Sequence, residues 1–316
     1  NTPRIDYSTG AEAFLLEPQS TNLITYSEDF SQSYWNKQSN ITPTYNTTEI
    51  LSPDGTYNAT KLIGNGNDGI YAQVNVSGVV SRSVYLRSVS DSAVVKLKDP
   101  VLTQTIKTIT LNETWQRYDL SESNLHGSIS GLWIDDIPSS GIYMWGAQLE
   151  QKSYATSYIP TDGASATRNQ ELCNNATPVI NSEEGTLYAE ISALEDDLTF
   201  RGLSISDGTT SNACRIYYRN SSNRVQFLFN VGGASQFQQT IDLTNIKDYN
   251  KIAFSYRQNN FKVYINGVKV AEDTNGIVPS ANTFNKLSFN RADGGESFFG
   301  NTKDLKYYPK ALADVQ

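Results

Sequence analysis

The stretch KVYINGVKV, residues 262–270, decides the fold class of this chain. Apolar Val263 and Ile265 alternate with larger polar residues, and an alternating run resumes after Asn266-Gly267. This period of two is that of a β-strand with one buried face. Asn-Gly between two such runs is the strongest short-range hairpin signal, because both turn residues must take positive φ. The stretch therefore predicts an antiparallel β-hairpin that turns at residues 266–267.

Strands of the same kind surround this hairpin through the second half of the chain. Seven are predicted by alternation, at residues 187–191, 203–206, 215–219, 225–231, 252–257, 261–265 and 287–289. The apolar members of three of these runs share one face, which we expect to be the core: Val225, Phe227, Phe229, Ile252, Phe254, Tyr256, Phe261, Val263 and Ile265. Only residues 309–315 are expected to form a turn or two of helix.

The first half shows a similar pattern. Its predicted strands are residues 70–76, 83–87, 93–97, 114–118, 131–134 and 142–149, separated by clusters of Gly, Ser and Pro. Residues 158–167 are small, polar and rich in breakers, so we place a domain boundary near residue 165. The fold class predicted is all-β, with two consecutive antiparallel β-sandwiches (jelly rolls) at residues 1–164 and 165–316.

Composition excludes two classes of partner. The formal net charge is -8 and no window holds a run of Lys or Arg, so nucleic acid is not expected to bind. No stretch approaches the ~20 apolar residues of a membrane span, so membrane insertion is not expected either. Because the chain begins at Asn1 without a basic-then-apolar leader, we expect a cut or processed piece of a longer protein.

The two cysteines, Cys173 and Cys214, form no CxxC pair and no disulfide framework. The sequence leaves open whether they bridge one another or remain separate thiols.

Three blocks of sequence carry a resemblance to known families. LLEPQSTNLI (residues 15–24) with YSEDF (26–30) and Tyr34-Trp35 resembles the opening of a jelly-roll module found in tailed-phage virion proteins and in bacterial surface or secreted proteins. WGAQLE (145–150) and SYATSYIPT (153–161) look like the last strand and exit of that module. DLKYYPKAL (304–312) is similar to the closing strand of laminin G-like, concanavalin A-like domains.

The resemblance implies a carbohydrate-binding-like jelly roll followed by a laminin G-like sandwich, located in the virion as part of a phage tail fibre or capsid decoration. The implied partners are a glycan or cell-surface polysaccharide and other virion or surface subunits. The alternative is a secreted or cell-surface protein: an adhesin, or an accessory carbohydrate-binding tandem from a bacterial polysaccharide-degrading enzyme. Related jelly rolls often hold a structural calcium with paired Asp in the final strand, where this chain has Gly-Ala-Gln-Leu; only Glu28, Asp29 and Glu150 remain as oxygen donors.

Catalytic constellations are absent from the sequence pattern. His126 is the only histidine and lies in a predicted loop, so His-based zinc sites and Ser-His or Cys-His catalysis lack their parts. Glycoside hydrolysis needs two carboxylates facing one cleft, whereas Glu190 and Glu195 are five residues apart and on opposite faces of an ideal strand. We therefore expect no enzyme and no cofactor.

Aromatic and arginine side chains form the candidate ligand-binding set. Sugar rings stack on aromatic faces, and their hydroxyl or acidic groups accept hydrogen bonds from arginine. On the face opposite the predicted core, alternation places Arg215, Tyr217, Arg219, Arg257 and Tyr264, which we expect to be exposed to solvent. The alternative is that they are ordinary solvent-face residues. The four tryptophans, Trp35, Trp115, Trp133 and Trp145, are assigned to core or rim packing.

Overall fold

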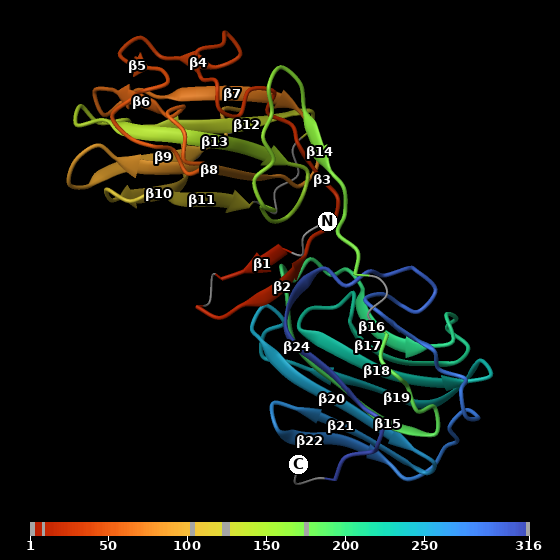
Figure 1. The fold of residues 1–316 in the computed structure, drawn as a ribbon. Helices are drawn as coiled ribbons and strands as arrows, with labels where there is room; N and C mark the ends of the chain where they lie inside the picture. Colours follow the sequence, from red (N-terminus) through yellow and green to blue (C-terminus); the bar gives the residue numbers. More distant parts are fainter. Residues whose placement is uncertain (1–3, 8–9, 102–104, 122–126, 174–176, 314–316) are drawn as a thin grey trace. The chain divides into compact units, whose positions relative to one another are not determined.

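The computed structural model describes residues 4–7, 10–101, 105–121, 127–173 and 177–313. These residues form an all-β protein without a helix, divided into two compact units (Figure 1). The jelly-roll unit is Gln19–Asn169, and the sandwich unit is Asn1–Pro18 together with Gln170–Gln316. The predicted fold class, an all-β chain of two antiparallel β-sandwiches, is confirmed.

The jelly-roll unit contains two five-stranded sheets and one two-stranded sheet, all antiparallel. The first sheet has the order β10 (Thr105–Leu111), β9 (Ala93–Lys98), β12 (Ile129–Asp135), β7 (Ile70–Asn75) and β4 (Asn36–Lys37). The second has the order β11 (Gln116–Ser121), β8 (Ser81–Ser88), β13 (Ile142–Glu150), β6 (Thr60–Ile63) and β5 (Thr42–Thr44). The two-stranded sheet pairs β14 (Ala166–Arg168) with β3 (Ser20–Asn22).

An ion pair lies inside this unit. Arg82 and Asp99 are both fully buried and bonded to each other, and Ser130 Oγ accepts from Arg82 at 2.8 Å. A buried charge is tolerated only when it is paired and hydrogen-bonded, and here both conditions are met. Removing either partner would leave the other as an uncompensated charge in the core.

The sandwich unit consists of a seven-stranded and a five-stranded sheet. The seven-stranded sheet has the order β1 (Arg4–Asp6), β2 (Ala13–Leu16), β24 (Gly300–Tyr308), β15 (Glu184–Ala193), β20 (Asn250–Arg257), β21 (Asn260–Ile265) and β22 (Val268–Asp273). The five-stranded sheet has the order β19 (Ala234–Asp242), β18 (Arg224–Val231), β17 (Ala213–Tyr218), β16 (Arg201–Ser206) and β23 (Lys286–Ser288).

The core of the sandwich unit is the one that alternation predicts. All nine expected core residues are buried, and Val225, Phe227 and Phe229 from β18 share one cluster with residues of β20 and β21. Rings interlock across the two sheets: the Phe229 centroid lies 5.0 Å from that of Tyr256 and 5.1 Å from that of Phe261. Edge-on and tilted aromatic pairs at these distances add to the hydrophobic gain from burial.

The Asn-Gly turn has the expected geometry. Asn266 and Gly267 have φ of 51° and 84°, and they join β21 to β22. Positive φ at both turn residues matches the right-handed twist of the flanking strands. The predicted hairpin is confirmed.

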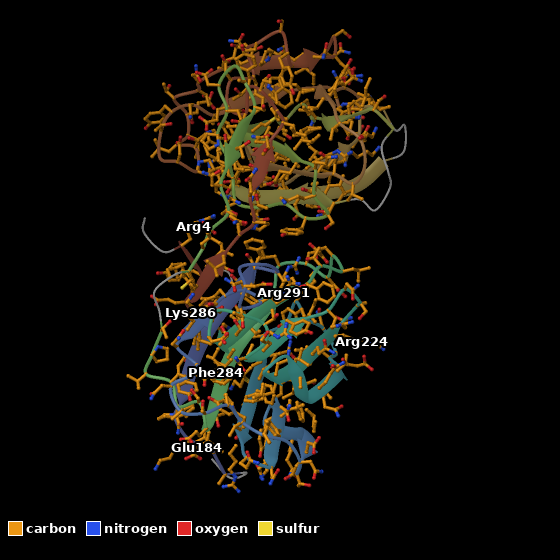
Figure 2. All side chains as sticks on the ribbon, turned by 90° about the vertical axis from the view of Figure 1, so that its right-hand side faces the viewer. Arg4, Glu184, Arg224, Phe284, Lys286 and Arg291 are labelled. Carbon is orange, nitrogen blue, oxygen red and sulfur yellow. The ribbon has the colours of Figure 1, made fainter. Side chains whose placement is uncertain are left out.

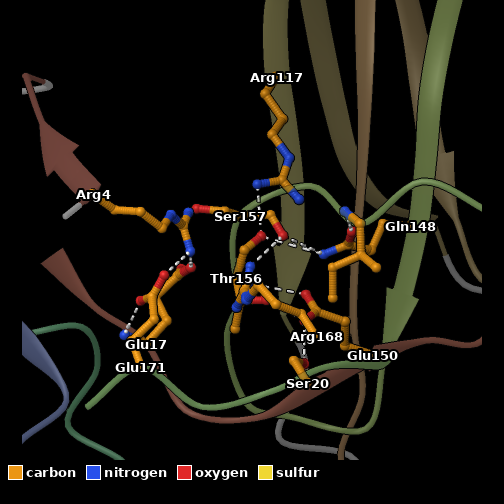
Figure 3. A network of polar contacts seen from close by, with 11 residues as sticks. Arg4, Glu17, Ser20, Arg117, Gln148, Glu150, Thr156, Ser157, Arg168 and Glu171 are labelled. Atoms are coloured by element: carbon orange, nitrogen blue, oxygen red, sulfur yellow. Dashed lines mark hydrogen bonds and ion pairs between the residues drawn. The ribbon is translucent and has the colours of Figure 1, made fainter. Parts of the chain in front are cut away.

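The N-terminal segment joins a different unit from the one expected. The sequence assigned residues 1–164 to one domain, but β2 pairs with β24, with Phe14 opposite Thr302, and Leu16 is buried in the sandwich core. Arg4 Nη1 lies 2.6 Å from Glu17 and 2.8 Å from Glu171, so charge pairs also hold this segment to residue 171 (Figure 3). The chain therefore enters the sandwich unit first and returns to it at residue 170, five residues after the expected boundary.

Strand β19 and the C-terminal segment also differ from the sequence expectation. Strand β19 was not predicted, because its alternation is polar: Gln236, Gln238 and Thr240 lie among few apolar residues, and most of the strand is exposed. Residues 309–313 form no helix; Leu312 N donates to Thr186 Oγ1 at 3.1 Å, which fixes this segment over β15. Residues 314–316 lie outside the described part of the chain.

Gly267 provides a test of the hairpin. Its φ is 84° and an added Cβ would meet no atom within 4 Å, so the cost of substitution is backbone strain alone. We expect Gly267→Val to lower the free energy of unfolding of the sandwich unit by about 1–3 kcal/mol, because a β-branched residue is strained at positive φ. Gly267→Asn is the matched control, since Asn tolerates this region, and should cost less. Equal losses for Val and Asn in chemical denaturation would contradict the turn assignment.

Candidate functional site

The five predicted ligand-binding residues lie on two different sheets. Arg215 and Tyr217 are in β17 and Arg219 follows it, so all three belong to the five-stranded sheet. Arg257 ends β20 and Tyr264 lies in β21, both in the seven-stranded sheet. Each points away from the core, as alternation requires, but the outward faces of two packed sheets are on opposite sides of a sandwich. The expected single face of five residues is therefore wrong.

The expected exposure also holds only in part. Arg257 is exposed and Tyr264 is half-buried, whereas Arg215 and Tyr217 are only 7% and 9% exposed. Tyr217 is covered because its hydroxyl bonds Gln226 and its ring lies 6.1 Å from that of Phe200. Arg219 Nη1 donates to the same Gln226 Oε1 at 2.8 Å. On this sheet the aromatic and amide groups contact each other rather than solvent.

A groove opens on the outer face of the seven-stranded sheet, with a volume of about 200 Å³. It is lined by residues of β15, β20, β21, the hairpin turn and the C-terminal segment: Thr186, Tyr188, Lys251, Ala253, Ser255, Tyr264, Gly267, Leu312 and Ala313. We call it the tyrosine groove. Tyr264 is the one predicted site residue that lines it.

Strand register explains why the groove exists. Ala253 pairs with Tyr188 on one side and with Tyr264 on the other, so a methyl side chain separates two tyrosines. Neighbouring strands are roughly 4.8 Å apart, which places the two tyrosine backbones roughly 10 Å from each other. Two aromatic walls thus stand on either side of a low floor.

The floor carries an unpaired hydroxyl. Ser255 is 1% exposed, and its Oγ has no hydrogen bond with any described residue. Buried polar groups normally have partners, and one without a partner marks a place where a water or ligand group completes the bonding. Ser255 Oγ is therefore available to a ligand hydroxyl that enters the groove.

Tyr188 remains a neutral phenol in this setting. Burial, followed by the nearby carboxylates Glu190 and Asp304, raises the pKa of Tyr188. Lys306 Nζ lies 5.8 Å from the ring centroid and forms a cation–π interaction with the ring. The tyrosine therefore offers an aromatic surface and an O–H donor at neutral pH.

The sequence identified Tyr264 but missed Tyr188, Ala253 and Ser255. Tyr188 lies in the predicted strand of residues 187–191, and Ala253 and Ser255 in that of 252–257. These residues come together only because their strands are neighbours in the sheet. Local alternation does not indicate which strands pair, least of all strands roughly 60 residues apart in the sequence. The outward tyrosine in residues 187–191 was the one available signal.

In the jelly-roll unit, each of the three carboxylates considered as calcium ligands accepts hydrogen bonds from different side chains. Glu28 accepts from Tyr158 and Asn58, and Asp29 accepts from Ser31 and Gln32. No group of three or more His, Cys, Asp or Glu placed to hold a metal occurs among the described residues.

Glu150 is the third of these carboxylates and is 1% exposed. Oε1 accepts from Ser20 and from Thr156 Oγ1, and Oε2 accepts from Thr156 N at 2.8 Å (Figure 3). A carboxylate with this many donors binds the segment after β13 to β3 as a structural group.

The sequence also singled out the tryptophans, the cysteines and His126. Trp35 and Trp145 are buried and Trp115 and Trp133 half-buried, in accord with packing roles. Cys173 and Cys214 are free thiols, so they do not bridge. His126 lies outside the described residues. No helix in the described part of the chain is long and apolar enough to cross a membrane.

A protein-family model matches the second half of the chain. Residues 162–316 match the laminin G family model described as the concanavalin A-like lectin/glucanases superfamily. That range contains the tyrosine groove and all five predicted ligand-binding residues. No curated protein sequence matches the chain.

Three solved structures show a weak similarity to the chain. The CBM22-1-CBM22-2 tandem of Paenibacillus barcinonensis Xyn10C is 11% identical, with 92% of this chain and 98% of that chain covered and a TM-score of 0.34. Mouse laminin alpha1 domains LG4-5 are 11% identical, with 79% and 90% covered and a TM-score of 0.32. A heptameric SAP-like pentraxin from Limulus polyphemus is 16% identical, with 44% and 70% covered and a TM-score of 0.34. The assignment of the sandwich unit to the concanavalin A-like fold rests on the family model.

Glu150 gives the prediction that separates a structural carboxylate from a calcium ligand. We expect Glu150→Gln to lower the free energy of unfolding of the jelly-roll unit by about 2–4 kcal/mol, because buried donors of Ser20 and Thr156 lose their charged acceptor. Asp29→Asn, at a more exposed carboxylate, is the control and should change it by less than about 1 kcal/mol. Added calcium should leave the melting temperature unchanged. A rise with calcium that Glu150→Gln abolishes would contradict the structural role.

Proposed function

We propose that this chain, whose C-terminal half has the laminin G-like, concanavalin A-like fold, is a non-catalytic glycan-binding protein. The tyrosine groove is the proposed binding site. The observation that carries the proposal is the pair Tyr188 and Tyr264 on either side of Ala253, above the unpaired Ser255 hydroxyl.

The groove suits a sugar ring for physical reasons. The apolar faces of a pyranose pack on aromatic rings, while its hydroxyls need a few fixed polar partners. Tyr188 and Tyr264 supply the rings, and Ser255 and Lys251 supply an acceptor-donor and a cationic donor at the groove. Its volume of about 200 Å³ is smaller than the ~300–1,000 Å³ of pockets for drug-sized ligands, so we expect one ring to enter rather than an enclosed chain.

Binding without hydrolysis follows from the lining. None of the residues that line the groove is Asp or Glu. Cleavage of a glycosidic bond requires an acid and a second carboxylate on either side of the bond. The lining therefore supports retention of a glycan and contains no carboxylate for its hydrolysis.

The biological setting that we propose is attachment within a phage tail fibre or capsid decoration, with other virion subunits as partners and the virion as location. The resemblance of residues 15–35 and 145–161 to virion modules supports this setting. The second setting is an accessory binding tandem of a secreted polysaccharide-degrading enzyme, or an adhesin. Neighbouring genes distinguish the two: tail and capsid genes support the first, and a fused glycanase supports the second.

Two substitutions test the groove. We expect Tyr188→Ala and Tyr264→Ala each to weaken binding of a polysaccharide that the chain retains by about 1–3 kcal/mol, because each removes one aromatic wall. Affinity electrophoresis in polysaccharide gels measures the loss of retention. Both side chains are only partly buried, so the melting temperature should stay within a few degrees of the original, by roughly the ΔΔG-to-Tm scale for surface residues.

Tyr57→Ala is the matched control, because Tyr57 is 54% exposed and belongs to the jelly-roll unit. It should leave retention unchanged. If both groove variants remain folded and migrate like the original protein in the gels that retard it, the glycan binds elsewhere and the proposed site is wrong.

A further inference from the structure

Arg215 is a buried cation without a partner. It lies on the outer face of the five-stranded sheet and is 7% exposed. Its Nε is buried without a hydrogen bond, and neither its terminal nitrogens nor its charge has a bonded partner among the described residues. The Tyr217 ring lies at cation–π distance, with its centroid 5.8 Å from Cζ. That contact stabilises the charge but uses none of the N–H donors.

The other arginines of this region are all engaged. Arg219 donates to Gln226 at 2.8 Å, and Arg224 lies 2.6 Å from Asp242. Arg201 lies 2.5 Å from Asp197. Arg215 therefore differs from these arginines in having no bonded partner. Burial of a guanidinium without an anion costs free energy, and no local contact compensates for it.

The nearest carboxylates do not fill this gap. Asp293 and Glu296 are close enough to favour the charged form of Arg215, yet both bind Arg291, at 2.8 and 2.9 Å. Burial is the largest influence and lowers the pKa of Arg215. The local acids thus neutralise another cation and leave Arg215 uncompensated.

A second unpaired group lies beside Arg215. Ser204 on β16 is its cross-strand neighbour, is fully buried, and its Oγ has no hydrogen bond with any described residue. Directly opposite residues on one face have Cβ atoms roughly 4.5–5.5 Å apart. The guanidinium and the hydroxyl therefore lie side by side on this face of the sheet. On the next strand, Ser288 pairs with Ser204 and extends the same row.

A further cation lies on the edge strand of this sheet. Lys286 on β23 is exposed, and the structure gives it no ion pair within the described residues. Strand β23 is the edge strand of the five-stranded sheet. Lys286 and Arg291 are both labelled in Figure 2. Gly202, next to Tyr217 across the strands, adds no side chain to this face.

We propose that Arg215 and Ser204 form an oxyanion subsite that binds the acidic group of a glycan, a carboxylate or a sulfate ester. Arg215 supplies a fork of two terminal N–H donors, and Ser204 Oγ supplies a third donor. A guanidinium matches two oxygens of either group in parallel hydrogen bonds. The subsite lies on the five-stranded sheet and the tyrosine groove on the seven-stranded sheet, so the two sites can be tested independently.

The test is isothermal titration calorimetry on the full chain with three oligosaccharides of equal length: an oligogalacturonate, a sulfated oligogalactan and a neutral maltooligosaccharide. We expect at least one acidic probe to bind and the neutral probe to bind more weakly. The acidic probe that binds distinguishes a carboxylate from a sulfate ester. Arg215→Gln should weaken acidic binding at least tenfold, and Arg215→Lys should weaken it less, because it keeps the charge but loses the fork.

Arg224→Gln is the matched control on the same sheet, because Arg224 is exposed and already paired with Asp242. It should leave acidic binding within twofold. Tyr188→Ala should weaken the neutral and the acidic probes alike, whereas Arg215→Gln should weaken only the acidic ones, which separates this subsite from the tyrosine groove. The melting temperature of Arg215→Gln should be equal to or above that of the original chain, because an uncompensated buried charge has been removed.

Three results would overturn the proposal. One is that neither acidic probe binds the original chain. Another is that Arg215→Gln binds acidic probes as well as the original chain does. The third is a lower melting temperature for Arg215→Gln, since this would reveal an internal partner for the charge.

Discussion

Packing of aromatic side chains between the two sheets of the sandwich unit is the interaction on which the rest of that unit depends. Phe229 lies at its centre, with ring centroids of Phe254, Tyr256, Phe261 and Phe284 within 6.3 Å. Because successive side chains on a strand point to opposite faces, burying these rings fixes the direction of every neighbour in the sequence. A slip of one residue in β18 would exchange Phe229 with Leu228 and reverse both faces of that strand.

The two outward faces that result have different chemistry. On the seven-stranded sheet, Tyr188 and Tyr264 stand on either side of Ala253 and leave a groove. On the five-stranded sheet, Tyr217 is covered by Gln226 and Phe200, and the unsatisfied group is the cation Arg215. One face therefore suits a neutral ring and the other an oxyanion, and a branched or charged polysaccharide has features of both kinds.

Local sequence pattern predicted the features that depend on neighbouring residues alone. Alternation gave the core residues of β18, β20 and β21, and Asn266-Gly267 gave the hairpin. It did not predict that residues 13–16 pair with β24, almost 300 residues away, nor that Arg215 and Tyr264 belong to different sheets. These facts depend on which strands become neighbours, and period-two patterns are the same for every partner strand. The half of the candidate site that was missed, Tyr188 and Ser255, depends on that pairing too.

The most direct test of the account is a crystal structure of the chain with an oligosaccharide selected on a glycan array. The account predicts one sugar ring between Tyr188 and Tyr264, with a ring hydroxyl within hydrogen-bond distance of Ser255 Oγ. An oligosaccharide bound only to the jelly-roll unit, with the tyrosine groove filled by solvent, would contradict it.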